Sequence, residues 1–169
     1  MPDRVLGAVL TGGRSSRFGS NKAIAQWNGR GLAEHAAALI AQHVDAVLTI
    51  GGDGGVPDLP APDLGPLGGI AGALDHAARH GFASVLTIGC DMPRVPSELL
   101  TALLRRAPAY CEDAPVLGHW SVNVLPGLLA WLNGEDGSVR GWARAVGALP
   151  IAAPAPLGNI NTREDLLAL

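Results

Sequence analysis

Three short apolar runs in the first half of the chain each lead into a glycine-rich or polar loop, a pattern typical of buried strands. They cover Val5–Leu10, Ala46–Ile50 and Ser84–Ile88. The segments that follow them have the apolar spacing of helices, which we predict over Leu32–Gln42, Pro66–Arg79 and Ser97–Arg106, with Ser97 as an N-cap. The alternation predicts an α/β fold in which helices cover both faces of a mostly parallel sheet.

The C-terminal third has a weaker pattern. We expect two further strands and two further helices there, the strands over Ala114–Trp120 and Leu149–Ala152 and the helices over Pro126–Leu132 and Ser138–Val146. Asn161 or Thr162 could cap a final short helix that has acidic residues in its first turn.

Composition favours one domain over residues 1–169, and it argues against several classes of partner. The net charge is −3, whereas a nucleic-acid-binding protein normally has a basic excess, so we expect no nucleic-acid partner. Cys90 and Cys111 lack the spacing of a zinc site or of a disulfide framework. We find neither a signal peptide nor an apolar run of about 20 residues, and therefore expect a cytoplasmic protein that does not contact membranes.

The loop after the first run carries the features of a phosphate-binding loop. It combines glycines, hydroxyl groups and the cations Arg14, Arg17 and Lys22, and Lys22 is the only lysine of the chain. Glycines let backbone amides approach phosphate oxygens, and cationic side chains add charge-assisted hydrogen bonds. The loop fits neither a Walker A nor a GxGxxG pattern. In a parallel sheet this loop and those after the next two strands lie at one edge, where such folds bind ligands.

Three aspartates lie in or near the later loops. Asp91 follows the third predicted strand, a favourable place for a Mg²⁺ ligand, although loop aspartates are often only turn formers. Asp53 lies among four glycines, and Asp63 precedes the Pro66 helix. From the residues alone, Asp63 is equally well explained as a solvated loop acid.

Four segments together resemble the MobA-type molybdenum cofactor guanylyltransferases, a family of nucleotidyltransferases. The first, LTGGRSSRFGSNKA over residues 10–23, resembles the signature LAGGxSxRMGxxKA, with Thr11 and Phe18 as replacements that we interpret as changes at packing positions. The others resemble D-x-x-GPLAG, CDMP and NxNTPEDL, and they occur here as DLGPLGG, CDMP and NINTREDL. The resemblance implies a Rossmann-like three-layer α/β/α sandwich like that of the nucleotide-diphospho-sugar transferases.

The resemblance also implies a reaction and its site. GTP would donate GMP to molybdopterin, with release of pyrophosphate and with Mg²⁺ as cofactor. Asp91 and Asn161 would hold the metal, with Asn161 favoured over Asn159. The nucleotide would lie against a set of loop residues, namely Leu10, Gly12, Gly13, Arg14, Lys22, Asp53, Asp63 and Asp91, and the catalytic residues would be Lys22, Arg17 and Asp91.

Several alternatives stay open. Asp53 could accept hydrogen bonds from guanine or could only form a turn, and a cytidylyl- or sugar-phosphate transferase would use the same loop. Compressed spacing after Tyr110 leaves the acceptor open and keeps a non-catalytic nucleotide-binding protein as an alternative. Proteins of molybdenum cofactor assembly are expected partners. His76 and His80 lack a third ligand and are interpreted as surface residues, and His119 is given no catalytic role.

Overall fold

A computed structural model describes residues 3–11, 26–27, 29–51, 55–62, 64–92, 94–134 and 137–157. The first half holds β1 (Val5–Leu10), β2 (Gln26–Trp27), β3 (Arg30–Gly31), α1 (Leu32–Ala41), β4 (Ala46–Ile50), α2 (Gly65–Arg79) and β5 (Ser84–Gly89). The second half holds α3 (Ser97–Leu104), β6 (Ala109–Cys111), β7 (Gly118–Ser121), the 3₁₀ helix η2 (Val122–Val124), α4 (Leu125–Trp131), α5 (Val139–Ala145) and β8 (Leu149–Ile151). None of the helices in these ranges has the length and apolarity needed to span a bilayer.

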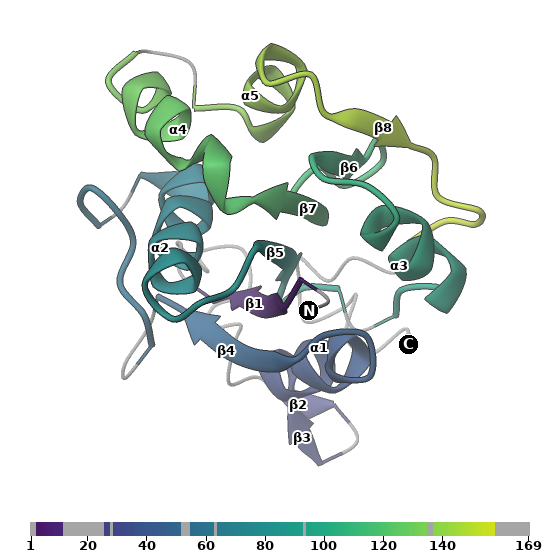
Figure 1. Ribbon diagram of the computed structural model, residues 1–169. Helices are drawn as coiled ribbons and strands as arrows, with labels where there is room; N and C mark the ends of the chain where they lie inside the picture. The colour runs from purple at the N-terminus through teal and green to yellow at the C-terminus, as the bar shows by residue number, and fades with distance from the viewer. Residues whose placement is uncertain are drawn as a thin grey trace.

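Six of the described strands form one sheet in the order β4-β1-β5-β7-β6-β8 (Figure 1). β1 pairs in parallel with both β4 and β5, and β6 pairs in parallel with β8. β7 is antiparallel to both of its neighbours, β5 and β6. β6 and β8 therefore run in the same direction as β1, and the predicted mostly parallel sheet is confirmed.

Helices cover both faces of the sheet, as the apolar runs predicted. α2, α4 and α5 lie on one face, and α1 and α3 lie on the other (Figure 1). Alternation along β1 explains the two layers, because Leu6 and Ala8 belong to the core under α2 while Val9 belongs to the core under α1 and α3. Trp120 and Trp142 are fully buried on the α2 side, with ring centroids 4.6 Å apart.

Two details differ from the sequence prediction. The strand expected over Ala114–Trp120 is the shorter β7, and the pattern did not reveal β6, whose three residues are too few for periodicity to show. Ser97 as N-cap was wrong: the N-cap of α3 is Pro96, and no side chain caps the helix. The Ser97 hydroxyl instead lies 3.5 Å from Nε2 of His43, because Ser97 is already the first helical residue.

Close backbone contact fixes the segment after β4 against α2. The N–H of Leu59 donates to the carbonyl of Gly68 at 3.0 Å. One turn further along α2, a Cβ at Gly72 would overlap the carbonyl oxygen of Pro57. Gly72 therefore allows the backbone of Pro57 to lie closer to α2 than any side chain at position 72 would permit. This contact fixes the position of the segment from Pro57 to Leu59 against the helix.

We predict that Gly72→Ala lowers the free energy of unfolding by about 1–3 kcal/mol, because the added methyl group must push the Pro57 backbone away. Denaturant unfolding measures the change. Gly127→Ala is the matched control, since Gly127 lies exposed in α4 with nothing near its Cβ position. Loss of a helical glycine there should stabilise the protein by up to about 1 kcal/mol. Equal effects of the two substitutions would contradict the argument.

Candidate active site at the carboxyl ends of β4, β1 and β5

The ends of three strands meet at one edge of the sheet. Leu10, the last residue of β1, is paired with Ile50 of β4 on one side and with Gly89 of β5 on the other. Because the three strands are parallel and end in register, the loops that follow them begin next to one another. The sheet therefore brings together the first residues of the three segments that follow these strands, namely Thr11, Gly51 and Cys90.

Thr11 fastens the start of the first loop to the end of β4. Its N–H donates to the carbonyl of Ile50 at 3.0 Å. Its hydroxyl lies 2.9 Å from that same oxygen and 3.1 Å from the carbonyl oxygen of Gly51, and donates its one proton between them. Interpretation of Thr11 as a packing replacement was therefore wrong, because the hydroxyl bridges two loops. The signal in the sequence was the hydroxyl itself at the strand end.

The loop after β4 turns back on its own strand. The N–H of Gly51 donates to the carbonyl oxygen of Val56 at 2.7 Å, and the N–H of Val56 donates to the carbonyl oxygen of Thr49 at 3.0 Å. Gly51 has φ of +77°, a conformation that favours glycine. A Cβ at Gly55 would overlap the Gly51 carbonyl oxygen. These contacts hold the two described ends of the loop, Gly51 and Gly55, close together.

Asp91 follows β5, which pairs with β1 on the side opposite β4. The N–H of Cys90 donates to the carbonyl oxygen of Leu10 at 3.2 Å, and the N–H of Met92 donates to the carbonyl oxygen of Gly89 at 3.3 Å. The second hydrogen bond shows that the chain turns immediately at the end of the strand. The Asp91 side chain is half-buried and folds back over Gly89, with one carboxylate oxygen 2.5 Å from the place of a Cβ there. Gly89 thus provides the space that the Asp91 carboxylate occupies.

Of the predicted site residues, the structure describes Leu10 and Asp91. The side chain of Leu10 faces α2 rather than the loops, because a Cβ at Gly69 would lie 3.2 Å from its Cδ2 atom. The other predicted site residues lie outside the described residues, and their roles stay predictions: Gly12, Gly13, Arg14, Arg17, Lys22, Asp53, Asp63 and Asn161. Within the described ranges, no three His, Cys, Asp or Glu residues are grouped as a metal site.

His119 is a buried structural residue. Its Nδ1 lies 2.9 Å from the carbonyl oxygen of Arg106 and 3.1 Å from that of Leu103, at the end of α3. Both partners are acceptors, so Nδ1 carries the proton and Nε2 accepts from the Ser84 hydroxyl at 2.8 Å. Burial lowers the pKa of His119, and the hydrogen bonds to Arg106 and Leu103 offset this only in part. In its neutral form the imidazole donates to carbonyls at the C-terminal end of α3 and of the turn that follows it.

We predict that the buried, neutral His119 makes the protein less stable in acid. The folded-state pKa of His119 lies below its ordinary value of 6.5, so below pH 6.5 the unfolded chain takes up the proton first. Stability is then lost as the pH falls from 6.5 toward the folded-state pKa, with a slope of up to about 1.4 kcal/mol per pH unit. Denaturant unfolding at several pH values should show a smaller slope in His119→Gln, which retains the other histidines. Identical slopes would refute the role of His119.

Loss of the Thr11 hydroxyl should loosen the two loops that it joins. We predict that Thr11→Ala lowers the free energy of unfolding by about 1 kcal/mol, whereas Thr11→Ser keeps the hydrogen bond and most of the stability. Thr101→Ala is the control, since Thr101 is exposed and its hydroxyl donates to Ser97 in its own helix; its effect should stay within about 0.5 kcal/mol. A Thr11→Ser variant as unstable as Thr11→Ala would contradict the hydrogen-bond explanation.

Comparison with known proteins agrees with this arrangement. Residues 7–148 match the family model of the MobA-like NTP transferase domain. The chain is 30% identical to the molybdenum cofactor guanylyltransferase of Rhodobacter capsulatus, over 96% of this chain and 93% of the relative. It is 32% identical to that of Rhizobium leguminosarum bv. trifolii, over 96% and 90%.

Solved structures show the same fold. Molybdopterin-guanine dinucleotide biosynthesis protein A from Archaeoglobus fulgidus superposes with a TM-score of 0.77 at 19% identity, over 96% of this chain and 95% of that one. The 2-C-methyl-D-erythritol 4-phosphate cytidylyltransferase from Thermus thermophilus superposes with a TM-score of 0.66 at 16% identity, over 95% of each chain. The order of sheet and loops, the family model and the relatives agree: the chain belongs to the MobA-like NTP transferases.

Proposed function

We propose that this chain transfers GMP from GTP to the terminal phosphate of molybdopterin and releases pyrophosphate. The observation that carries the proposal is the junction of Leu10, Ile50 and Gly89, which gathers the three loops at one edge of the sheet. Membership of the MobA-like NTP transferases and the names of the curated relatives support guanylyl transfer to the molybdenum cofactor. The donor would be GTP, and the acceptor would be molybdopterin.

Positioning and charge neutralisation would supply most of the catalysis. The attacking phosphate of the acceptor is already anionic, so no general base is needed, and the new P–O bond forms as the bond to pyrophosphate breaks. Lys22 and Arg17, with Arg14, would stabilise the charge on the leaving pyrophosphate. Backbone amides at Gly12 and Gly13 would orient the triphosphate.

Asp91 fits a Mg²⁺ ligand by its chemistry and place. Its carboxylate is half-buried directly after the central strand, and Gly89 leaves room for it beside the strand end. Mg²⁺ commonly uses one or two carboxylates, with phosphate oxygens and water as the remaining ligands, so no larger acidic cluster is needed. When bound, the ion would neutralise phosphate charge. We propose that Asn161 contributes a neutral oxygen to the same ion.

Two further aspartates would select the nucleotide. We propose that Asp53 accepts hydrogen bonds from the guanine base; the contacts of Gly51 and Val56 at the end of β4 support a role for this loop. Asp63 would contact the ribose or the base from the segment that α2 holds by backbone contact. We propose that the reaction takes place in the cytoplasm and that assembly proteins deliver the pterin.

The reaction can be tested directly by incubating the purified protein with Mg²⁺, molybdopterin and each nucleoside triphosphate in turn. We expect pyrophosphate and the molybdopterin guanine dinucleotide with GTP, and little product with CTP, ATP or UTP. Preference for CTP would replace guanylyl by cytidylyl transfer. Stabilisation by GTP without pyrophosphate release would indicate a nucleotide-binding protein that does not catalyse transfer.

Asp91→Asn should lower the transfer rate by roughly 100-fold or more, because the charged metal ligand supplies several kcal/mol of transition-state stabilisation. The variant keeps the size of the side chain, so its unfolding curve should stay close to that of the parent protein. Gly89→Ala should also lower the rate, since the new Cβ displaces the Asp91 carboxylate. Asp75→Asn is the control, because Asp75 pairs with the exposed Arg79 on α2. Normal activity in Asp91→Asn would remove Asp91 from the mechanism.

A further inference from the structure

Two histidines lie face to face at the C-terminal end of α2. The rings of His76 and His80 are stacked, with centroids 4.0 Å apart and an angle of 16° between their planes. His76 belongs to the last turn of the helix and is half-buried, whereas His80 is the C-cap and is exposed. Residues four apart on a helix face the same way, so the two imidazoles form one feature of the surface. The proposed transfer reaction uses neither of them.

Hydrogen bonds to one carbonyl group hold the His80 ring in place. The N–H of His80 donates to the carbonyl oxygen of His76 at 3.1 Å, and Nδ1 of its ring lies 2.8 Å from the same oxygen. Because a carbonyl only accepts, Nδ1 carries the proton, and Nε2 of the neutral ring keeps its lone pair for a ligand. Metal-binding histidines are commonly oriented in this way, with one ring nitrogen donating to a backbone carbonyl.

The helix end that carries the pair is itself well fixed. Gly81 follows with φ of +79°, and the N–H of Phe82 donates back to the carbonyl oxygen of Ala77 at 2.9 Å. The Phe82 ring is buried, with the guanidinium carbon of Arg4 4.2 Å from its centroid. A ligand that binds to side chains on such a rigid element costs less ordering entropy than one that binds to a loop.

The charges around the pair are compatible with a bound cation. Nε of Arg79 lies 2.9 Å from a carboxylate oxygen of Asp75, so the neighbouring guanidinium charge is compensated. Burial and the nearby His80 lower the pKa of His76, which favours the neutral ring that can bind a metal. Within the part of the chain that the structure describes, no third His, Cys, Asp or Glu joins the two histidines. Water would therefore fill the remaining coordination positions.

We propose that Nε2 of His80 and a ring nitrogen of His76 chelate a divalent late transition-metal ion, such as Zn²⁺ or Ni²⁺, at the end of α2. Metal–imidazole bonds of about 2.0–2.1 Å to both rings would bridge a gap of this size once the rings tilt toward each other. Imidazole nitrogen suits zinc, nickel and copper, whereas Mg²⁺ prefers oxygen ligands. The pair therefore selects a different ion from the one proposed at Asp91.

The histidine pair lies at the sheet edge opposite the candidate active site. Directly after α2, the N–H of Ala83 donates to the carbonyl oxygen of Arg4 at 2.9 Å, at the point where β1 and β5 begin. Asp91 follows the other end of β5. An ion on the histidines would join two residues one helical turn apart without contact with the strand ends. Its binding is thus independent of the transfer reaction.

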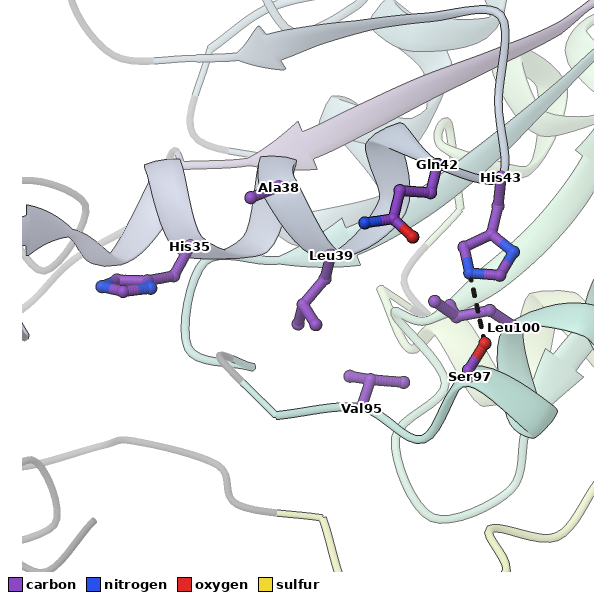
Figure 2. A pocket seen from close by; sticks show the side chains of 8 residues that line it. All are labelled: His35, Ala38, Leu39, Gln42, His43, Val95, Ser97 and Leu100. Atoms are coloured by element: carbon purple, nitrogen blue, oxygen red, sulfur yellow. Dashed lines mark hydrogen bonds between the residues drawn. The ribbon is translucent and has the colours of Figure 1, made fainter.

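Calorimetric titration of the full chain with Ni²⁺ tests the site, in excess Mg²⁺ and at about pH 8, where an ordinary imidazole is neutral. We expect one ion per chain, bound roughly 10-fold or more weakly by His76→Gln and by His80→Gln, because each variant loses the chelate. The double variant should lose little beyond either single variant. His43→Gln is the matched control: His43 has no histidine one turn away and faces Ser97 (Figure 2), so its loss should leave the affinity unchanged.

Thermal unfolding gives a second readout. Ni²⁺ should raise the unfolding midpoint of the parent protein and of His43→Gln but not that of His80→Gln, since the ion binds only the folded helix end. Midpoints without added metal show whether each variant folds, and if half-buried His76 does not tolerate Gln, exposed His80 decides alone. Unchanged affinity in His80→Gln, or an equal loss in His43→Gln, would overturn the proposal. One ion per two chains, with a dimer in sedimentation, would also overturn it by assigning the metal to two copies.

Discussion

Parallel pairing of β1 with β4 and β5 is the constraint on which the rest of this protein depends. In register, the three strands end together at Leu10, Ile50 and Gly89. Backbone hydrogen bonds from Thr11 and Cys90 then extend the pairing one residue past the strand ends. Loops that are far apart in the sequence therefore begin on adjacent strands, with the loop after β1 one strand spacing from each of the other two, which is what a triphosphate needs from a binding edge.

Glycines have three distinct uses around this edge, and each has a steric reason. Gly51 takes a left-handed conformation that lets the loop after β4 turn back. Gly72 lets the Pro57 backbone approach α2, and Gly89 leaves space for the Asp91 carboxylate. At Gly72 and Gly89 the missing side chain lets backbone or a charged group come closer than alanine would permit, so these two glycines set positions rather than flexibility.

The two faces of the sheet differ in what they do. On the α2 face, the core is large and aromatic, with Trp120 and Trp142 packed together and the Trp120 indole donating to Thr87 at 3.0 Å. On the α1 and α3 face, a groove of about 300 Å³ lies between α1 and the start of α3, with Leu39, Val95 and Leu100 in its lining. His119 joins the sheet to the end of α3 on this face, so its protonation would weaken the packing of a helix without touching the strand ends.

The sequence alone determined the alternation of strands and helices, because buried parallel strands and amphipathic helices leave periodic apolar patterns. It also indicated the family, because the loops of a phosphate site need glycines and cations in a long, specific order. It could not reveal β6, whose three residues carry no periodicity, or the N-cap of α3, which depends on where the helix begins. The role of Thr11 and the space that Gly89 leaves for Asp91 come from contacts between segments distant in the chain, and only the tertiary structure decided them.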